Sequence, residues 1–433
     1  RLAIGLACLD YISGQCVGFN KIESTIAGIA TFYNATGNVH VTGIITAANF
    51  AKADGSSLGG FSQDAQCNLY GGDGAGAASD ADTTFNIALG CKAANSLNSG
   101  DHNVILGTYA SRCLTSGNKN VSIGAYALRR NESGGYNIAL GEGTMQTGTS
   151  GDDRVAIGRH ANRYGTGSCN VAIGMCALAG ASSGTVDGTF NVAIGRYAGR
   201  NYTTGTANVF LGKNAGRTLT TGSNNIAIGC YSMCGGAVTG DHNIVIGCKT
   251  GCALTSGNHN VIMGRDSGPK LTDGSGNTFL GGGAGKYTDS SSQSVFIGCA
   301  SGHNSEGNQV TAIGFRAGHG GGTKTGCVFV GAYAGNETTD ATCAIHIGFK
   351  AGCAVTSGVR NIIIGDNLAH TLTTGDCNIL IGSQMDVASS STSTTFAIGC
   401  GTNRWITGDS SFNTTLAGIA TVYGATGIVS ATK

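Results

Sequence analysis

Two pairs of histidines recur at matching places in this chain and could bind a metal ion. His242 and His259 each lie five residues before a regularly recurring glycine, and His303 and His319 each lie five residues after one. Stacked or symmetry-related imidazoles are suitable ligands for a transition metal such as Zn²⁺. Elsewhere the earlier place holds a single His or Cys without a matching carboxylate or second histidine: His102, Cys169, Cys343 and Cys377. We therefore interpret these histidines as turn residues and predict no metal site.

Two glycine-rich stretches resemble loops that carry chemistry in enzymes. Residues 180–184, Gly-Ala-Ser-Ser-Gly, match the turn that presents a nucleophilic serine, but no strand-turn-helix pattern surrounds them. Residues 71–76 lack the spacing and the Lys-Ser/Thr pair of a phosphate-binding loop. No paired carboxylates or nucleophile-base spacing recur along the chain. The sequence thus predicts no catalytic or cofactor-binding residue and a protein that is not an enzyme.

The 17 cysteines follow the spacing of the recurring glycine and include no C-x-x-C pair. Eight of them directly follow that glycine or come four residues after that position, which is five after the glycine: Cys91, Cys230, Cys248, Cys299 and Cys400, then Cys234, Cys252 and Cys353. If repeats stack about 4.8 Å apart, Cys230 could form a disulfide with Cys248, and Cys234 with Cys252. We expect instead small, buried, reduced thiols in a protein assembled in a reducing cytoplasm.

These residues are positioned by a repeat that covers most of the chain. Its marker is the glycine that closes motifs such as Asn191-Val192-Ala193-Ile194-Gly195. The marker glycines are Gly90, Gly107, Gly124, Gly141, Gly158, Gly174, Gly195, Gly212, Gly229, Gly247, Gly264, Gly281, Gly298, Gly314, Gly331, Gly348, Gly365, Gly382 and Gly399. Of the 18 intervals, 14 are 17 residues long. Such regularity predicts a β-solenoid of stacked coils, and residues 68–72 add a weaker twentieth copy.

Each repeat contains a short strand with two apolar faces. The residue before the marker glycine is Leu, Ile, Val or Met in all 19 copies, and the residue two places earlier is Ile or Val in 16. These two share one face of the strand. The residue between them points the other way and is also mostly apolar, with Ser122 and His346 as polar exceptions. Because a thin solenoid has one interior, we expect identical chains to cover the second apolar row around a symmetry axis.

Two further features concern the turns. Asparagine often precedes the strand, as Asn208 and Asn225 do, and its side chain could bond the turn backbone or form a ladder with the next asparagine. The 21-residue interval between Gly174 and Gly195 places extra residues at 181–187, which we predict to be a loop leaving the wall of the rod.

The composition excludes several classes of protein. The chain has 433 residues, of which 75 are Gly, one is Pro and only 49 are charged. Glycine supplies the positive φ angles of tight turns, as a solenoid requires. A formal net charge of +1 gives no electrostatic signal for nucleic acid or an anionic membrane. No apolar run is long enough to span a bilayer, and no signal-peptide pattern is present. We expect neither nucleic acid nor membrane insertion.

The two ends of the chain match each other and differ from the rod. Residues 2–37 share an ordered series of short motifs with residues 396–427, about 390 residues apart. We predict a junction module at 1–67, a solenoid rod at 68–401 and the start of a second junction at 402–433. Within the first junction, residues 38–45 indicate a strand and residues 47–51 a short helix ending near Gly55. The chain is then one segment of a longer fibre.

Two resemblances to known families rest on these motifs. The triplet Ala193-Ile194-Gly195, followed by the small residue Ala198, resembles the repeats of the trimeric β-roll heads of bacterial autotransporter adhesins, although those repeats are typically shorter than 17 residues. Over residues 68–401 this resemblance implies a parallel β-roll built from three chains. Residues 28–31, 35–37 and 405–408 are similar to modules in virion structural proteins of tailed phages of marine cyanobacteria, which are assigned to tail fibres or similar appendages.

Together, these observations predict an all-β, parallel β-solenoid fibre of a phage virion. The expected partners are identical chains in a homotrimer, further copies of the block along the fibre, other virion proteins and a host surface receptor. One alternative is a trimeric adhesin on a bacterial cell surface, and another is a β-helix enzyme that acts on polysaccharides. The enzyme would need carboxylates or basic residues aligned in one groove, which the charged residues do not indicate. Flanking sequence with further copies of the block would favour the virion fibre, and a C-terminal barrel would favour the adhesin.

Overall fold

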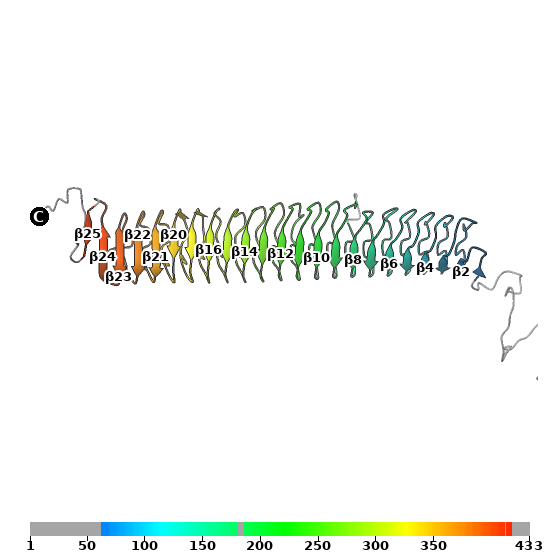
Figure 1. The fold of residues 1–433 in the computed structure, drawn as a ribbon, viewed down its shortest axis with the longest axis horizontal. Coiled ribbons are helices and arrows are strands. Elements are labelled where there is room, and N and C mark those ends of the chain that lie inside the picture. The colour runs from blue at the N-terminus through cyan, green and yellow to red at the C-terminus, as the bar shows by residue number, and fades with distance from the viewer. Residues whose placement is uncertain (1–61, 181–185, 412, 418–433) are drawn as a thin grey trace, which may run out of the picture. The chain divides into compact units, whose positions relative to one another are not determined.

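The computed structural model describes residues 62–180, 186–411 and 413–417. These residues form an all-β rod in which 20 strands stack in one parallel sheet along the long axis (Figure 1). The strands of the stack are β2 (Leu69–Gly71), β3 (Ile87–Leu89), β4 (Val104–Leu106), β5 (Val121–Ile123), β6 (Ile138–Leu140), β7 (Val155–Ile157), β8 (Val171–Ile173), β9 (Val192–Ile194), β10 (Val209–Leu211), β11 (Ile226–Ile228), β12 (Ile244–Ile246), β13 (Val261–Met263), β14 (Thr278–Leu280), β15 (Val295–Ile297), β16 (Thr311–Ile313), β18 (Val328–Val330), β20 (Ile345–Ile347), β21 (Ile362–Asp366), β22 (Ile379–Ser383) and β23 (Phe396–Cys400).

Each strand pairs with the equivalent strand of the next coil. Val209, for example, lies opposite Val192 on one side and Ile226 on the other. The prediction of a parallel solenoid with a 17-residue repeat is therefore confirmed, and the weaker copy at 68–72 is a coil of its own, because β2 pairs in parallel with β3. The described residues contain no helix that could cross a lipid bilayer.

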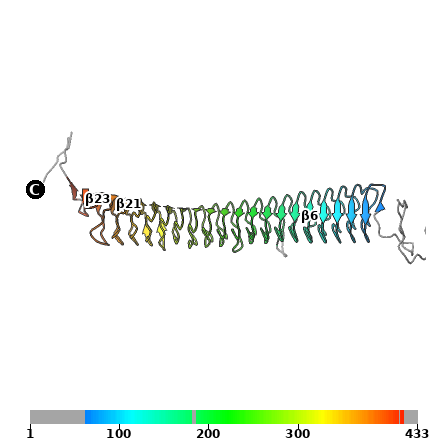
Figure 2. The same cartoon turned by 90° about the horizontal axis from the view of Figure 1, so that it is seen from below.

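Antiparallel strands border the stack at its two ends. β1 (Ser62–Gln63) pairs with β2, and β24 (Asn403–Gly408) pairs with β23 and with β25 (Thr414–Leu416). These strands occupy hydrogen-bonding edges that would otherwise be open to other chains. A small separate sheet of β17 (Lys324–Thr325) and β19 (Ala341–Thr342) lies across the coils from the long sheet (Figure 2). The strand predicted at 38–45 and the helix predicted at 47–51 lie outside the described residues.

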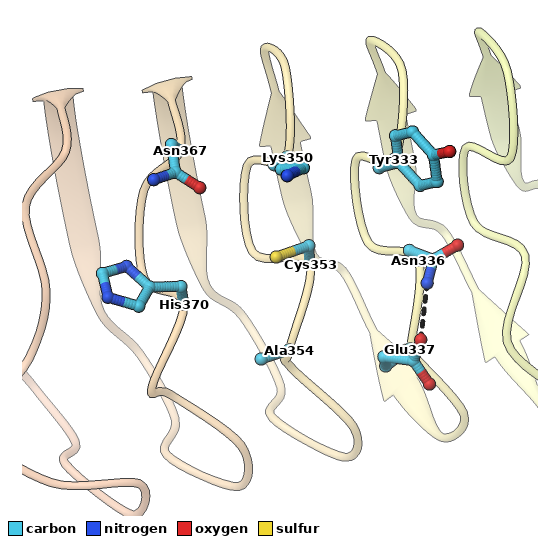
Figure 3. Close-up of a pocket in the computed structure, with 8 residues that line it drawn as sticks. All are labelled: Tyr333, Asn336, Glu337, Lys350, Cys353, Ala354, Asn367 and His370. Atoms are coloured by element: carbon cyan, nitrogen blue, oxygen red, sulfur yellow. Dashed lines mark hydrogen bonds between the residues drawn. The ribbon is translucent and has the colours of Figure 1, made fainter.

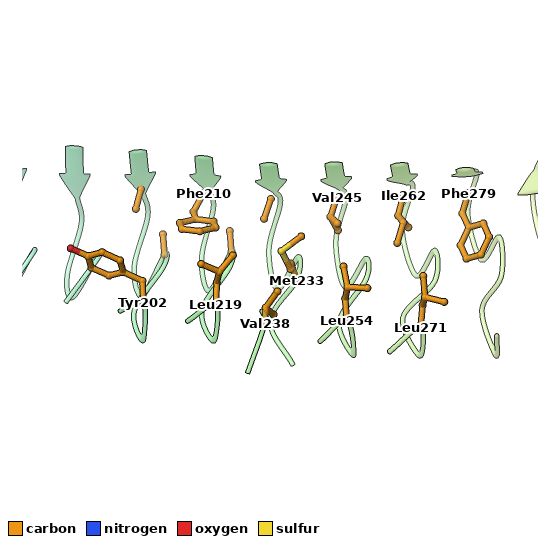
Figure 4. Close-up of a cluster of buried hydrophobic side chains, with 14 of the residues drawn as sticks. Tyr202, Phe210, Leu219, Met233, Val238, Val245, Leu254, Ile262, Leu271 and Phe279 are labelled. Atoms are coloured by element: carbon orange, nitrogen blue, oxygen red, sulfur yellow. The ribbon is translucent and has the colours of Figure 1, made fainter. Parts of the chain in front are cut away.

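Each strand of the stack points its middle residue into the coil and its outer two residues outward. Phe210 is fully buried in β10, whereas Leu211 keeps 43 % of its surface exposed. Across the interior, a second row from the opposite wall meets the strand row. Figure 4 shows Leu219, Leu254 and Leu271 facing the strand residues. One apolar row of each strand is thus buried inside its own coil, as predicted.

The interior is filled by complementary side-chain sizes. In some coils a small strand centre is followed six positions later by a large residue: Leu178 after Ala172, and Met145 after Ala139, all of them buried. In others, such as Ala193 with Gly199, the space is filled by Leu178 and Phe210 of the neighbouring coils. Where the centre is Phe279, the equivalent position is Gly285, whose Cβ would lie 2.8 Å from the ring. Close packing tolerates neither a void nor an overlap, so side-chain sizes must match both within a coil and between neighbouring coils.

An asparagine ladder runs through the interior beside the strands. Asn208 donates both its backbone N–H and its side-chain amide to Oδ1 of Asn191, each at 3.0 Å, and its amide also donates to the Gly222 carbonyl at 2.9 Å. Its own Oδ1 accepts the backbone N–H of Asn225 at 2.9 Å. The ladder and the turn-backbone bond, which the sequence left as alternatives, occur together.

Removing one rung of this ladder should destabilise the rod. Asn208→Ala leaves the Gly222 carbonyl and the Asn225 N–H without their buried partners, so we expect a loss of about 2–4 kcal/mol. Urea unfolding followed by circular dichroism measures the effect. Asn224→Ala is the matched control, because Asn224 is exposed. The equivalent residue one repeat earlier is Ala207, which has a φ of 55° against 57° for Asn224, so alanine is tolerated at this left-handed position. Equal losses for the two variants would contradict a structural ladder.

The ladder is interrupted at two places. Arg154 replaces an asparagine and is fully buried; its Nε donates to Asn137 Oδ1 at 2.9 Å, and its Nη1 donates to the Gly165 carbonyl at 2.9 Å. Burial lowers the pKa of Arg154 to about 10. Farther along, four consecutive coils have no asparagine in this row and carry Ser294, Val310, Cys327 and Ala344 instead.

The marker glycines have a steric explanation. Gly264 has a φ of +123°, and a Cβ built on it would lie 2.6 Å from the carbonyl oxygen of Gly281 in the next coil. Residues other than glycine do not readily adopt this φ, and their Cβ atom does not fit into that gap. The marker position therefore requires glycine because the coils stack closely there.

Candidate functional surfaces

The histidine pairs stack as rings rather than converge on an ion. The His242 and His259 rings lie 5.0 Å apart and 3° from parallel, and the His303 and His319 rings lie 4.6 Å apart and 13° from parallel. Imidazole lone pairs lie in the ring plane, so the lone pairs of parallel rings do not meet at one point. Burial, with His319 as the next contributor, lowers the pKa of His303 to about 4, so this ring is neutral at pH 7. Within the described ranges, no group of three or more His, Cys, Asp or Glu could hold a metal.

The first glycine-rich stretch forms turns of a coil, and most of the second lies outside the described residues. Gly72, Gly74 and Gly76 belong to turns of the first coil, with φ angles of +112°, +65° and +60°. Gly180 begins the extra segment of the longest interval, and the serines of its motif lie outside the described residues. Part of the predicted loop is not a loop away from the wall: Val186 is buried in the core, and its carbonyl accepts the Thr166 N–H at 2.8 Å.

The cysteines are mostly not buried, contrary to expectation. Of the 15 described cysteines only Cys327 is buried, and all 15 are free thiols. The same repeat positions hold long basic residues in other coils, such as Lys213 and Arg217 one coil before Cys230 and Cys234, so they lie on the outward side of the coil. Cys234 and Cys252 approach to 3.7 Å between their Sγ atoms. The Cys252 hydrogen bond lowers the pKa of Cys234 to about 7.

A shallow groove lies on one flank of the rod. It is lined by side chains that follow the marker glycine by two, five or six residues in successive coils, and Figure 3 shows them in parallel rows. Tyr333, Lys350 and Asn367 form one row, and Asn336, Cys353 and His370 form the next. The lining side chains include one carboxylate, Glu337, so the groove does not contain the paired carboxylates of a glycosidase.

The first extended surface is the sheet face, which we define as the outward residues at the first and third positions of the 20 stacked strands. Nearly all are Val, Ile, Leu or Met, and none is charged. Ile123, Ile194 and Met263 each keep 38 % of their surface exposed. If each of the forty side chains exposes roughly a third of its area, the face totals on the order of 2,000 Å², against the few hundred Å² usual for a monomer.

The second surface is the basic flank, which we define as the charged and aromatic residues one to six places after the marker glycine in the seven coils that begin at Gly107 to Gly212. Its residues are Tyr109, Arg112, Tyr126, Arg129, Arg130, Arg159, Arg163, Tyr164, Arg196, Tyr197, Arg200, Lys213 and Arg217. Glu142 is the one carboxylate at these positions. The near-zero net charge of the chain concealed this surface, and sorting the charges by repeat position would have found it.

No protein-family model, curated protein or solved structure matches this chain.

Proposed function

We propose that this chain is a structural subunit of a fibre, in which three identical chains pack their sheet faces around a common axis. The observation that carries the proposal is the sheet face itself, an apolar surface along 20 coils in which only Gly71, Thr278 and Thr311 depart from the pattern. Burying apolar surface is the main driving force of association, and a face of this size is typical of obligate interfaces. The resemblance to trimeric β-roll heads supports three chains.

The fibre is a phage virion appendage, a tail fibre or similar structure that supports host attachment. The resemblance of the two junctions to virion modules supports this assignment. Stiffness along the axis comes from the parallel hydrogen-bond ladder and the asparagine ladder together. A cell-surface adhesin would use the same rod, and the flanking sequence distinguishes the two: further 390-residue blocks belong to the virion fibre, and a membrane barrel belongs to the adhesin.

The oligomeric state tests the core of this proposal. Sedimentation equilibrium of the purified chain should give three times the chain mass at micromolar concentration. Leu211→Asp with Ile228→Asp places two charges on neighbouring strands of the sheet face, so we expect dissociation or a shift of the association constant by at least a hundredfold, because unpaired buried charges are costly.

A matched control carries the same two charges elsewhere on the same coils. Thr204 and Thr221 are exposed in the turns before β10 and β11, so Thr204→Asp with Thr221→Asp should leave the mass unchanged. A wild-type chain that stays monomeric at high concentration would overturn the proposal, and a dimer would overturn the threefold arrangement.

A further inference from the structure

The basic flank concentrates positive charge that the described part of the chain does not neutralise. Nine Arg or Lys side chains and one carboxylate lie on it over seven coils. The ion pairs of the described residues, Arg265 with Asp266 and His370 with Asp386, lie elsewhere. Because successive coils stack at about 4.8 Å, like charges stand well within a Debye length of one another. An external anion would relieve this repulsion.

Tyrosines hold the guanidinium groups in place. The Arg196 and Arg200 guanidinium carbons lie 4.8 and 4.9 Å from the centre of the Tyr197 ring. Arg129 lies 5.4 Å from the Tyr126 ring centre in the same way. Cation–π contacts of this kind order a flexible side chain without using its N–H donors. Arg163 Nε donates to Gln146 Oε1 at 2.9 Å. Arg196 Nη2 donates to Tyr197 Oη at 3.4 Å, which leaves the other N–H groups of these two guanidinium groups for a ligand. The flank thus presents a row of oriented donors suited to carboxylate, sulfate or phosphate oxygens.

The same contacts argue against nucleic acid. Proteins that bind single-stranded nucleic acid use free aromatic faces on which bases stack. Here the Tyr197 ring has two guanidinium groups against it, and the Tyr109 and Tyr126 rings stack on each other at 5.5 Å. Because these aromatic faces are already covered, we expect a ligand that is recognised through its negative charges.

The carboxylates of the same coils lie in a different part of the coil. Glu132, Asp152, Asp153 and Asp187 are exposed in the turn that leads back to the strand. If a second identical rod packed against the flank, its four exposed carboxylates would be too few to neutralise the nine cations. A separate polyanion that extends along the axis matches both the sign and the linear arrangement of the flank.

We propose that the basic flank binds a linear anionic polysaccharide, aligned with the rod axis, through Arg112, Arg129, Arg163, Arg200 and their neighbours. Five of the seven coils carry at least one cation at these positions, so an extended polyanion along the axis contacts several of them at once. This site goes beyond the proposed fibre function and does not depend on the number of chains in the fibre.

Binding of the full chain to three probes tests the proposal. Heparin and polygalacturonate should bind, while neutral dextran should not, and the affinity should fall steeply with added salt because bound counterions are released. Arg129→Gln, Arg163→Gln and Arg200→Gln together should weaken heparin binding at least tenfold and flatten the salt dependence by roughly three charges.

The control removes three cations that lie off the flank. Lys119→Gln, Arg360→Gln and Arg404→Gln change the net charge equally and should leave binding within twofold of the wild type, with both triple variants checked for folding by circular dichroism. Equal weakening by the two triple variants would overturn the site. Tighter binding to single-stranded DNA of matched charge than to either polysaccharide would overturn the ligand class.

Discussion

Gly264→Ala is expected to prevent normal stacking of the coils on either side of it. The substitution meets two penalties at once, because a residue with a Cβ avoids a φ of +123° and because that Cβ would lie 2.6 Å from the Gly281 carbonyl oxygen. Backbone atoms of the next coil cannot move aside without breaking the pairing of β13 with β14. We expect a loss of more than about 4 kcal/mol, the range of exceptional single mutations. Thermal unfolding and limited proteolysis between residues 250 and 295 should both report it.

The same coil provides a control glycine. Gly276 also has a positive φ, +69°, but a Cβ there would lie 3.8 Å from the nearest atom, Gln293 Cγ. The equivalent positions hold His259 and Gln293 at φ angles of 57° and 56°, so a side chain is tolerated. Gly276→Ala should cost about 1 kcal/mol or less. If Gly264→Ala proved as mild as Gly276→Ala, close stacking would not be the reason for the marker glycine.

His346→Phe should stabilise the rod and remove part of its acid sensitivity. His346 is the fully buried centre of β20, and neither ring nitrogen has a hydrogen-bond partner. Its ring packs edge-on against Phe329 at 5.3 Å, and Gly352 leaves room beside it. Phenylalanine already stands at this position in β14, β15 and β18. Replacing unsatisfied nitrogens by carbon should add about 1–3 kcal/mol at pH 7.5.

The pH dependence has a definite sign. Burial lowers the pKa of His346 to about 3, below the value near 6.5 of an unfolded histidine. Between these two pH values the unfolded chain binds more protons, so wild-type stability falls as the pH drops below 6.5. The phenylalanine variant lacks this contribution, and its advantage should grow between pH 6.5 and pH 4.

Denaturant unfolding at pH 7.5 and pH 4.5 measures this difference. His242→Phe serves as the control, since His242 is exposed and stacked on His259, and it should leave the pH dependence as in the wild type. Parallel pH profiles for the wild type and His346→Phe would show that the buried imidazole does not set the acid response.

The strands and their stacking could be predicted from the sequence because each coil repeats the same local pattern. Side chains of a strand point alternately to its two faces, so Phe210 points to the opposite side from Val209 and Leu211. The regular interval from Val209 to Ile226 sets the register between neighbouring strands. Both properties repeat in every coil, so the structure of one coil predicts that of the next. The partner of Asn208 could not be chosen in advance, since an amide of that geometry satisfies a turn or a ladder equally well.

The second apolar row of the strands could be predicted in the same way, but the flank was harder to predict because it depends on which way residues outside the strand point. Cys230 and Cys234 occupy repeat positions that hold Lys213 and Arg217 one coil earlier, so their outward direction follows from comparing the copies and not from the small size of the thiol. Val186 lies in an insertion of irregular length, where counting from the marker glycine loses its meaning. The basic flank depends on Arg129, Arg163 and Arg200 coming from different coils onto one side, which the net charge of +1 hides.

The in-register stacking of the coils makes the length of the rod a quantity that changes in discrete steps. Each additional coil extends the molecule by the same rise, about 4.8 Å, and contacts only its two neighbours. Duplication or deletion of one 17-residue unit in a gene would therefore lengthen or shorten the structure by one fixed increment while both neighbours kept their packing. The number of repeats therefore sets the length of the rod.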